Sequence, residues 1–295
     1  SGSSVSLSSD GTIVAIGATY NDGNAPNAGH TRIYQYSSGS WSQLGSDIDG
    51  EAASDYAGYS VSLSSDGTKV AIGAYGNNGA ATDAGHTRIY QYSSGSWSQL
   101  GGDIDGEAAS DNSGYSVSLS SDGTKVAIGA KENDGNGTRA GHTRIYQYSS
   151  GSWSQLGSDI DGEVIYDQSG SSVSLSSDGT IVAIGATYND GNAPNAGHTR
   201  IYQYSSGSWS QLGSDIDGEA ASDQSGFSVS LSSDGTIVAI GAYANDGNGT
   251  SAGHTRMYSL QTNSTPTNIT LNPTTVNENV SIGTTVGSLS TTDSD

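Results

Sequence analysis

The chain has 295 residues, of which 30 are acidic and 9 are basic, so its formal net charge is −21. Such a surface repels phosphate backbones and excludes nucleic acid as a partner. The chain has no cysteine, which excludes disulfides and thiolate chemistry, and no apolar run longer than "IVAIGA", so no membrane span is predicted in it.

A unit of 56 residues recurs along the chain. The five histidines, at positions 30, 86, 142, 198 and 254, are evenly spaced by this period, and residues 1–55 are identical to residues 169–223. A fixed period of this size indicates a solenoid, a propeller or an array. The chain opens inside a repeat and without a Met, so we expect it to be an excerpt of a longer protein.

Each copy predicts four strands, because apolar and small polar residues alternate with period two. In the second copy these segments are 59–65, 68–74, 85–92 and 97–104. The dipeptide "DG" at 66–67 predicts a two-residue hairpin between the first two strands. Nothing in the copy shows a helical pattern, so the unit reads as a four-stranded antiparallel meander.

Repeated four-stranded units predict an all-β fold, a β-propeller with five visible blades. The fifth copy lacks "SGSWSQLG", so its blade is expected to lack the outer strand. We expect Val5, Leu7, Val14 and Ile16 to supply apolar filling between blades. A solenoid is the rival architecture, and the two hairpins of each unit argue against it.

The unit "GYSVSLSSDGTKVAIGA…AGHTRIYQY" resembles the FG-GAP repeat, the blade of integrin α-chain propellers and of many bacterial surface proteins. Gly226 and Phe227 carry the aromatic-glycine element in reversed order, and "IGA" recurs in all five copies. The resemblance covers residues 1–260 and implies a propeller used outside the cell for adhesion. The calcium loop of that family is not expected here, since "SSDGT" offers a single carboxylate.

The repeat ends after Leu260, and residues 261–265 read as a linker. Residues 266–295 resemble the opening strands of a bacterial cadherin-like domain, a β-sandwich, through "NEN", "GTTVGSL" and "DSD". By that resemblance Glu278, Asp293 and Asp295 are implied as calcium ligands between successive domains.

A second candidate for calcium is the acidic stretch "SDIDGEAASD", because calcium favours several oxygen ligands on a loop turned by glycine. The alternative is an ordinary acidic turn whose Asp side chains accept bonds from nearby backbone N–H groups. The copies of this stretch place carboxylates at Asp47, Asp49, Glu51, Asp55, Asp103, Asp105, Glu107, Asp111, Asp159, Asp161, Glu163, Asp167, Asp215, Asp217, Glu219 and Asp223.

For the other candidate functional residues, the sequence favours structural roles. "NDGN" is typical of a turn, although the variable loop ends that follow it ("APNAG", "AATDAG", "GTRAG", "GTSAG") are where binding specificity would lie. The repeated His residues are expected to pack, and each repeated Arg is expected to pair with a carboxylate of its own or an adjacent blade. No catalytic set is recognised among the residues that occur once: Lys131, Glu132, Arg139 and Tyr166.

These patterns together predict a non-enzymatic adhesion or recognition module of a large bacterial protein, extracellular or at the cell surface, that binds a protein or carbohydrate ligand through propeller loops. A propeller lectin with repeated sites between blades is the alternative. A propeller hydrolase is a third hypothesis, which the missing catalytic set disfavours.

Overall fold

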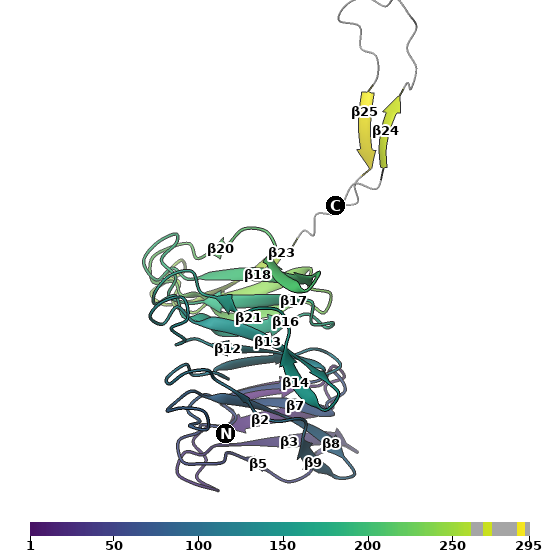
Figure 1. The fold of residues 1–295 in the computed structure, drawn as a ribbon, viewed down its shortest axis with the longest axis vertical. Helices are drawn as coiled ribbons and strands as arrows, with labels where there is room; N and C mark the ends of the chain where they lie inside the picture. The colour runs from purple at the N-terminus through teal and green to yellow at the C-terminus, as the bar shows by residue number, and fades with distance from the viewer. Residues whose placement is uncertain (261–267, 273–287, 293–295) are drawn as a thin grey trace, which may run out of the picture. The chain divides into compact units, whose positions relative to one another are not determined.

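The computed structural model describes residues 1–260, 268–272 and 288–292, and these form strands and turns without a helix. The chain divides into two compact units, Ser1–Ser259 and Leu260–Asp295. In the first unit each repeat forms its own sheet, and the sheets follow one another from purple to green in Figure 1. The fold is therefore an all-β, five-bladed propeller, as predicted. Within the described ranges no helix has the length and hydropathy that crossing a membrane requires.

Each of the first four blades has an inner, a second, a third and an outer strand paired antiparallel in that order, and a two-residue strand that also pairs with the third. The first blade contains β1 (Ser4–Leu7), β2 (Ile13–Ala18), β3 (His30–Ser37), β4 (Ser40–Gln43) and β5 (Ile48–Asp49). The second contains β6 (Ser60–Leu63), β7 (Lys69–Ala74), β8 (His86–Ser93), β9 (Ser96–Gln99) and β10 (Ile104–Asp105). The third contains β11 (Ser116–Leu119), β12 (Lys125–Ala130), β13 (His142–Ser149), β14 (Ser152–Gln155) and β15 (Ile160–Asp161).

The fourth blade contains β16 (Ser169–Leu175), β17 (Ile181–Ala186), β18 (His198–Ser205), β19 (Ser208–Gln211) and β20 (Ile216–Asp217). The fifth is a three-stranded sheet of β21 (Ser225–Leu231), β22 (Ile237–Ala242) and β23 (His254–Ser259), which confirms that it lacks the outer strand. In the second unit β24 (Asn268–Asn272) pairs antiparallel with β25 (Ser288–Thr292). The predicted linker 261–265 lies outside the described residues.

Two local predictions are wrong. The segment 97–104 is not one strand but two, β9 and β10, because Gly101 between them has a φ of 79° and leaves the extended conformation. The bend makes room for Trp153 of the next blade, whose indole Nε1 donates to the Leu100 carbonyl at 2.7 Å. The "DG" hairpin is in fact a longer turn, in which the Asp66 carboxylate accepts the Thr68 N–H at 2.9 Å.

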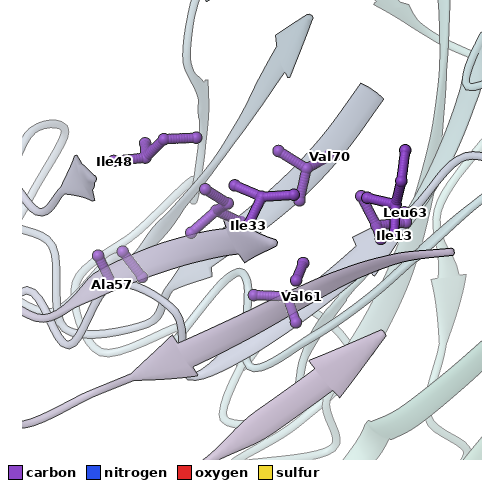
Figure 2. Close-up of a cluster of buried hydrophobic side chains, with 10 residues drawn as sticks. Ile13, Ile33, Ile48, Ala57, Val61, Leu63 and Val70 are labelled. Atoms are coloured by element: carbon purple, nitrogen blue, oxygen red, sulfur yellow. The ribbon is translucent and has the colours of Figure 1, made fainter. Parts of the chain in front are cut away.

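The apolar core lies between consecutive blades. Between the first two blades Ile13 and Ile33 meet Val61, Leu63 and Val70, and Figure 2 shows Ile33 beside Val70 and Ile13 beside Leu63. Equivalent clusters join the second blade to the third and the third to the fourth. The second and third sheets thus each bury both faces against their neighbours, the arrangement that a propeller requires.

The two end blades depart from this arrangement. Val5 is 66% exposed and Leu7 59%, whereas their copies Val61 and Leu63 are 8% and 7% exposed. At the other end Met257 is 72% exposed, although its copy Ile33 is fully buried. The prediction that Val5 and Leu7 fill the interior is therefore wrong for the described residues, among which no blade covers that face of the first sheet.

Candidate functional site

One cavity lies where the five blades converge. It has a volume of about 270 Å³, and every blade contributes to its lining. The same position of each repeat, at or near the start of the inner strand, reaches it: Ser3, Tyr59, Tyr115, Ser171 and Phe227. Since five equivalent positions can line one cavity only around a common axis, we call it the axial cavity.

The axial cavity is lined by positions at which the repeats differ. The repeat position just after the second strand contributes Lys131, Thr187 and Tyr243, but is Thr19 and Tyr75 in the other copies. The remaining lining residues, Tyr188, Gln168 and Gln224, also stand at variable positions. The invariant segments build the sheets, and a group of the positions that differ between repeats lies together at this cavity.

Lys131 and Glu132 form a charged group at this cavity. The Lys131 Nζ lies 3.6 Å from Glu132 Oε1 and 4.1 Å from the centroid of the Tyr115 ring. The Arg139 Nε lies 2.9 Å from Glu132 Oε2, and the Gln168 amide donates to Glu132 Oε1 at 3.0 Å. The third blade thus brings together three of the four residues that occur once, Lys131, Glu132 and Arg139, a grouping that the sequence did not indicate.

Tyrosine rings form the wall beside Lys131. The Tyr59 ring centroid lies 4.8 Å from that of Tyr115 and 4.6 Å from that of Tyr75. Burial raises the pKa of the Tyr59 phenol, and a hydrogen bond with Tyr115 adds to the effect. Burial also raises the pKa of Tyr75 to about 12. These phenols are therefore neutral at physiological pH and can donate hydrogen bonds.

A second hollow, of about 330 Å³, lies on the other side of the same charged group. Glu132 and Arg139 line it together with Asp83, Asp134 and Thr138. Thr138 and Arg139 belong to the loop end "GTRAG", one of the variable ends that the sequence singled out for specificity. This loop thus holds Arg139 against Glu132, next to the axial cavity.

The predicted calcium ligands of one copy have three different kinds of partner in the structure. Asp47 accepts two bonds from Arg32 and one from Gln43. Glu51 pairs instead with Arg88 of the next blade, Nη1 to Oε1 at 3.0 Å. Asp55 is 1% exposed and accepts the backbone N–H groups of residues 51 and 52, the turn that was the alternative reading.

The later copies repeat this division with small differences. Asp111 and Asp167 accept the same pair of backbone N–H groups, whereas Asp223 accepts the Ala220 N–H and an amide N–H of Asn245. Arg144 and Arg256 contact Glu107 and Glu219 of the preceding blades, and Arg200 Nη1 lies 3.2 Å from Glu163 Oε1. The predicted pairing of the repeated Arg residues is thus confirmed.

Four groups at these junctions have donor atoms close enough to hold a metal ion. They are His30 with Asp47 and Asp49, Glu51 with His86 and Asp103, Glu107 with His142 and Asp159, and Glu163 with His198 and Asp215. The His142 Nδ1 lies 3.8 Å from Asp159 Oδ2, too far for a hydrogen bond. The adjacent Arg already supplies positive charge to the acids, which favours an ion-pair network. Sequence reasoning placed the acids but not the His beside them.

Burial makes these histidines neutral. It lowers the pKa of His86 to about 4, and the nearby Arg88 charge acts in the same direction. His142 and His198 have lowered pKa values from the same two causes. The other predicted calcium ligands, Glu278, Asp293 and Asp295, lie outside the described residues.

Comparisons with known proteins find the fold but no sequence relative. No protein-family model matches the chain, and no curated protein does. Among solved structures it resembles a candidate 6-phosphogluconolactonase from Bacteroides uniformis ATCC 8492, with 14% identity and a TM-score of 0.56 over 92% of this chain and 75% of that one. It also resembles the periplasmic gluconolactonase of Pseudomonas aeruginosa, with 15% identity and a TM-score of 0.56 over 92% and 76%.

These neighbours correct the predicted function. Both carry the names of lactonases, which are enzymes, so the prediction of a non-enzymatic adhesion module, with a lectin as its alternative, is wrong on this comparison. The FG-GAP and integrin-like resemblance gains no support, since no family model matches. At these identities the likeness itself shows the shared propeller fold.

Proposed function

We propose that the chain is a hydrolase of the lactonase type, which adds water across the cyclic ester bond of a sugar lactone in the axial cavity. The observation that carries the proposal is the convergence of the variable repeat positions on that one cavity. The invariant positions are sufficient to build blades, so the residues that differ are those free to serve chemistry. The lactonase names of the neighbours supply the reaction class.

The lining suits a polyhydroxylated ring. A volume of about 270 Å³ is near the lower end of the range of ligand pockets, which is of the order of 300 Å³ and upward. The Tyr59 and Tyr115 rings offer flat apolar surface, and the amides of Gln168 and Gln224 offer donors and acceptors for hydroxyl groups. A carbohydrate, which the sequence suggested as a ligand, is here proposed as the substrate.

Lys131 is the group that we assign to the reaction. Attack of water on a lactone carbonyl places negative charge on the carbonyl oxygen, and a cation in a partly buried site stabilises it. The Lys131 side chain is 19% exposed and is held by Glu132 and the Tyr115 ring, so its ammonium is positioned before the substrate binds. Hydrolysis of the ring ester then yields the open-chain hydroxy acid.

The charge of the site favours an uncharged lactone over a phosphorylated one. Lys131 is the one basic residue of the cavity lining, and the Glu132 carboxylate already offsets its charge. A phosphate group would therefore bring about two further negative charges into a protein of net charge −21. We expect glucono-δ-lactone to be a better substrate than its 6-phosphate.

The test compares two lysine substitutions that the repeats themselves carry. Lys131→Thr introduces the residue found at positions 19 and 187, and Lys125→Ile the residue found at positions 13 and 181. Each removes one positive charge, but only Lys131 lines the axial cavity. Lactone hydrolysis, followed by acid release above the spontaneous rate, should fall about 100-fold for Lys131→Thr, the loss typical of a missing oxyanion donor. Lys125→Ile should keep it. Wild-type protein that hydrolyses no aldonolactone would refute the proposal.

We also infer a location outside the cytoplasm, which the periplasmic neighbour supports. Cell fractionation of the native source would test it, and recovery in the cytoplasmic fraction would contradict it. Calcium at the acidic turns stays a proposal. Titration with calcium during thermal unfolding tests it, and an unchanged midpoint would contradict it.

A further inference from the structure

One face of the first sheet is exposed, whereas the equivalent face of each later sheet packs against the blade that precedes it. This leading face comprises Val5 and Leu7 of β1, Val14 of β2, Tyr34 of β3 and Trp41 of β4. A hollow of about 310 Å³ opens on it between Val14, Tyr34 and Trp41. Trp41 is 48% exposed, and Val5 and Leu7 are more than half exposed.

The fourth blade shows what normally covers this face, because its residues 169–223 are identical to residues 1–55. There the Trp209 indole N–H donates to the Leu156 carbonyl of the third blade at 2.7 Å. The Leu175 N–H donates to the Ser118 hydroxyl at 3.0 Å. Val173 and Leu175, the copies of Val5 and Leu7, are 9% and 7% exposed.

The ion pairs of the repeated Arg residues differ between the first and the fourth blade in the same way. Arg200 reaches back to Glu163 of the third blade, and its side chain is 8% exposed. Its copy Arg32 is 43% exposed and pairs instead with Asp47 of its own blade, Nη2 to Oδ2 at 2.8 Å. The first blade therefore presents a donor at Trp41, a cation at Arg32 and an apolar patch, in the arrangement that the trailing face of another blade satisfies at each internal junction.

We propose that the leading face of the first blade is a docking surface for one more blade of this same type. The partner blade presents apolar residues equivalent to Ile145 and Ile160, a carbonyl equivalent to that of Leu156, and a carboxylate equivalent to Glu163. Docking moves Arg32 from Asp47 to the new carboxylate and buries Val5, Leu7 and Trp41. The contact continues an interface that the chain already forms between its blades.

The experiment adds residues 113–168 directly before Ser1 of the full chain. Since residue 169 follows residue 168 and residues 1–55 copy residues 169–223, the new junction repeats the one between the third and fourth blades. The probe is 5-fluorotryptophan observed by ¹⁹F NMR, with the Trp41 resonance assigned by Trp41→Phe. In the unextended chain this resonance should stand apart from those of Trp97, Trp153 and Trp209, whose indole N–H groups are bonded to the preceding blade.

In the extended chain the Trp41 resonance should join that group, and the tryptophan of the added blade should take over the exposed position. The matched control carries the same 56 residues after Asp295, away from the leading face, and should leave the Trp41 resonance unchanged. An unmoved Trp41 resonance in the extended chain would overturn the proposal, whether the added blade is folded or unfolded. An equal shift in the control would do so too.

Discussion

The same substitution at two copies of one position measures what a neighbouring blade contributes to stability. Leu63 is 7% exposed and Leu7 is 59% exposed, although both lie at the end of an inner strand with the same local sequence. Replacing a buried Leu by Ala costs about 2–5 kcal/mol, through lost apolar burial and the cavity left behind. Leu7 has less than half of its surface to lose and leaves no closed cavity, so its cost should be about 1 kcal/mol.

We therefore expect Leu63→Ala to destabilise the chain by about 2 kcal/mol more than Leu7→Ala. Urea unfolding, followed by tryptophan fluorescence and by circular dichroism, gives the free energy of unfolding of each variant where the two probes coincide. Hydrogen exchange of the first and second blades shows whether the loss is local. Equal losses for the two variants would refute the reasoning, because they would mean that the face of the first blade is covered as well.

Three further results are expected. Trp153→Phe should lower the free energy of unfolding by about 1 kcal/mol, because the hydrogen bond to the preceding blade is lost. Trp41→Phe should lower it by less than about half of that. Denaturant midpoints measure both losses, and equal losses would contradict the prediction. Because burial holds the pKa of His86 at about 4, below that of the unfolded chain, the unfolded state binds more protons between these values, so stability should fall by on the order of 1–2 kcal/mol between pH 7 and pH 5. His86→Gln should flatten that pH profile, and an unchanged slope would count against the assignment. Gly185→Ala should lower the melting temperature more than Gly241→Ala, since only at Gly185 would the new Cβ overlap the backbone of the following blade; the reverse order would contradict the blade contact.

Much of the fold followed from local pattern. Alternation within a repeat predicted the strands, and the missing "SGSWSQLG" predicted the three-stranded fifth blade. The pairing of Arg88 with Glu51 also followed, because a buried cation in an acidic chain needs a carboxylate. The break at Gly101 did not follow, because its reason is the Trp153 ring of another blade, and packing between blades is absent from the sequence of one repeat.

The candidate site was missed for a related reason. Tyr59, Lys131 and Gln168 are far apart in the sequence, and only the arrangement of consecutive blades about one axis brings them to one cavity. No sequence motif marks them, because they belong to different segments of the repeats and are not neighbours in the sequence. The usable signal was the position-by-position difference between otherwise identical copies, read as a set rather than residue by residue.

The most direct test of the axial cavity as the functional site is the electron density of the crystallised chain in complex with gluconate, the hydroxy acid that hydrolysis of glucono-δ-lactone yields. Density for the acid between Tyr59 and Gln224, with its carboxylate within hydrogen-bond distance of the Lys131 Nζ, is the predicted result. Density for the acid at another place on the propeller, with the axial cavity holding only water, would contradict the account.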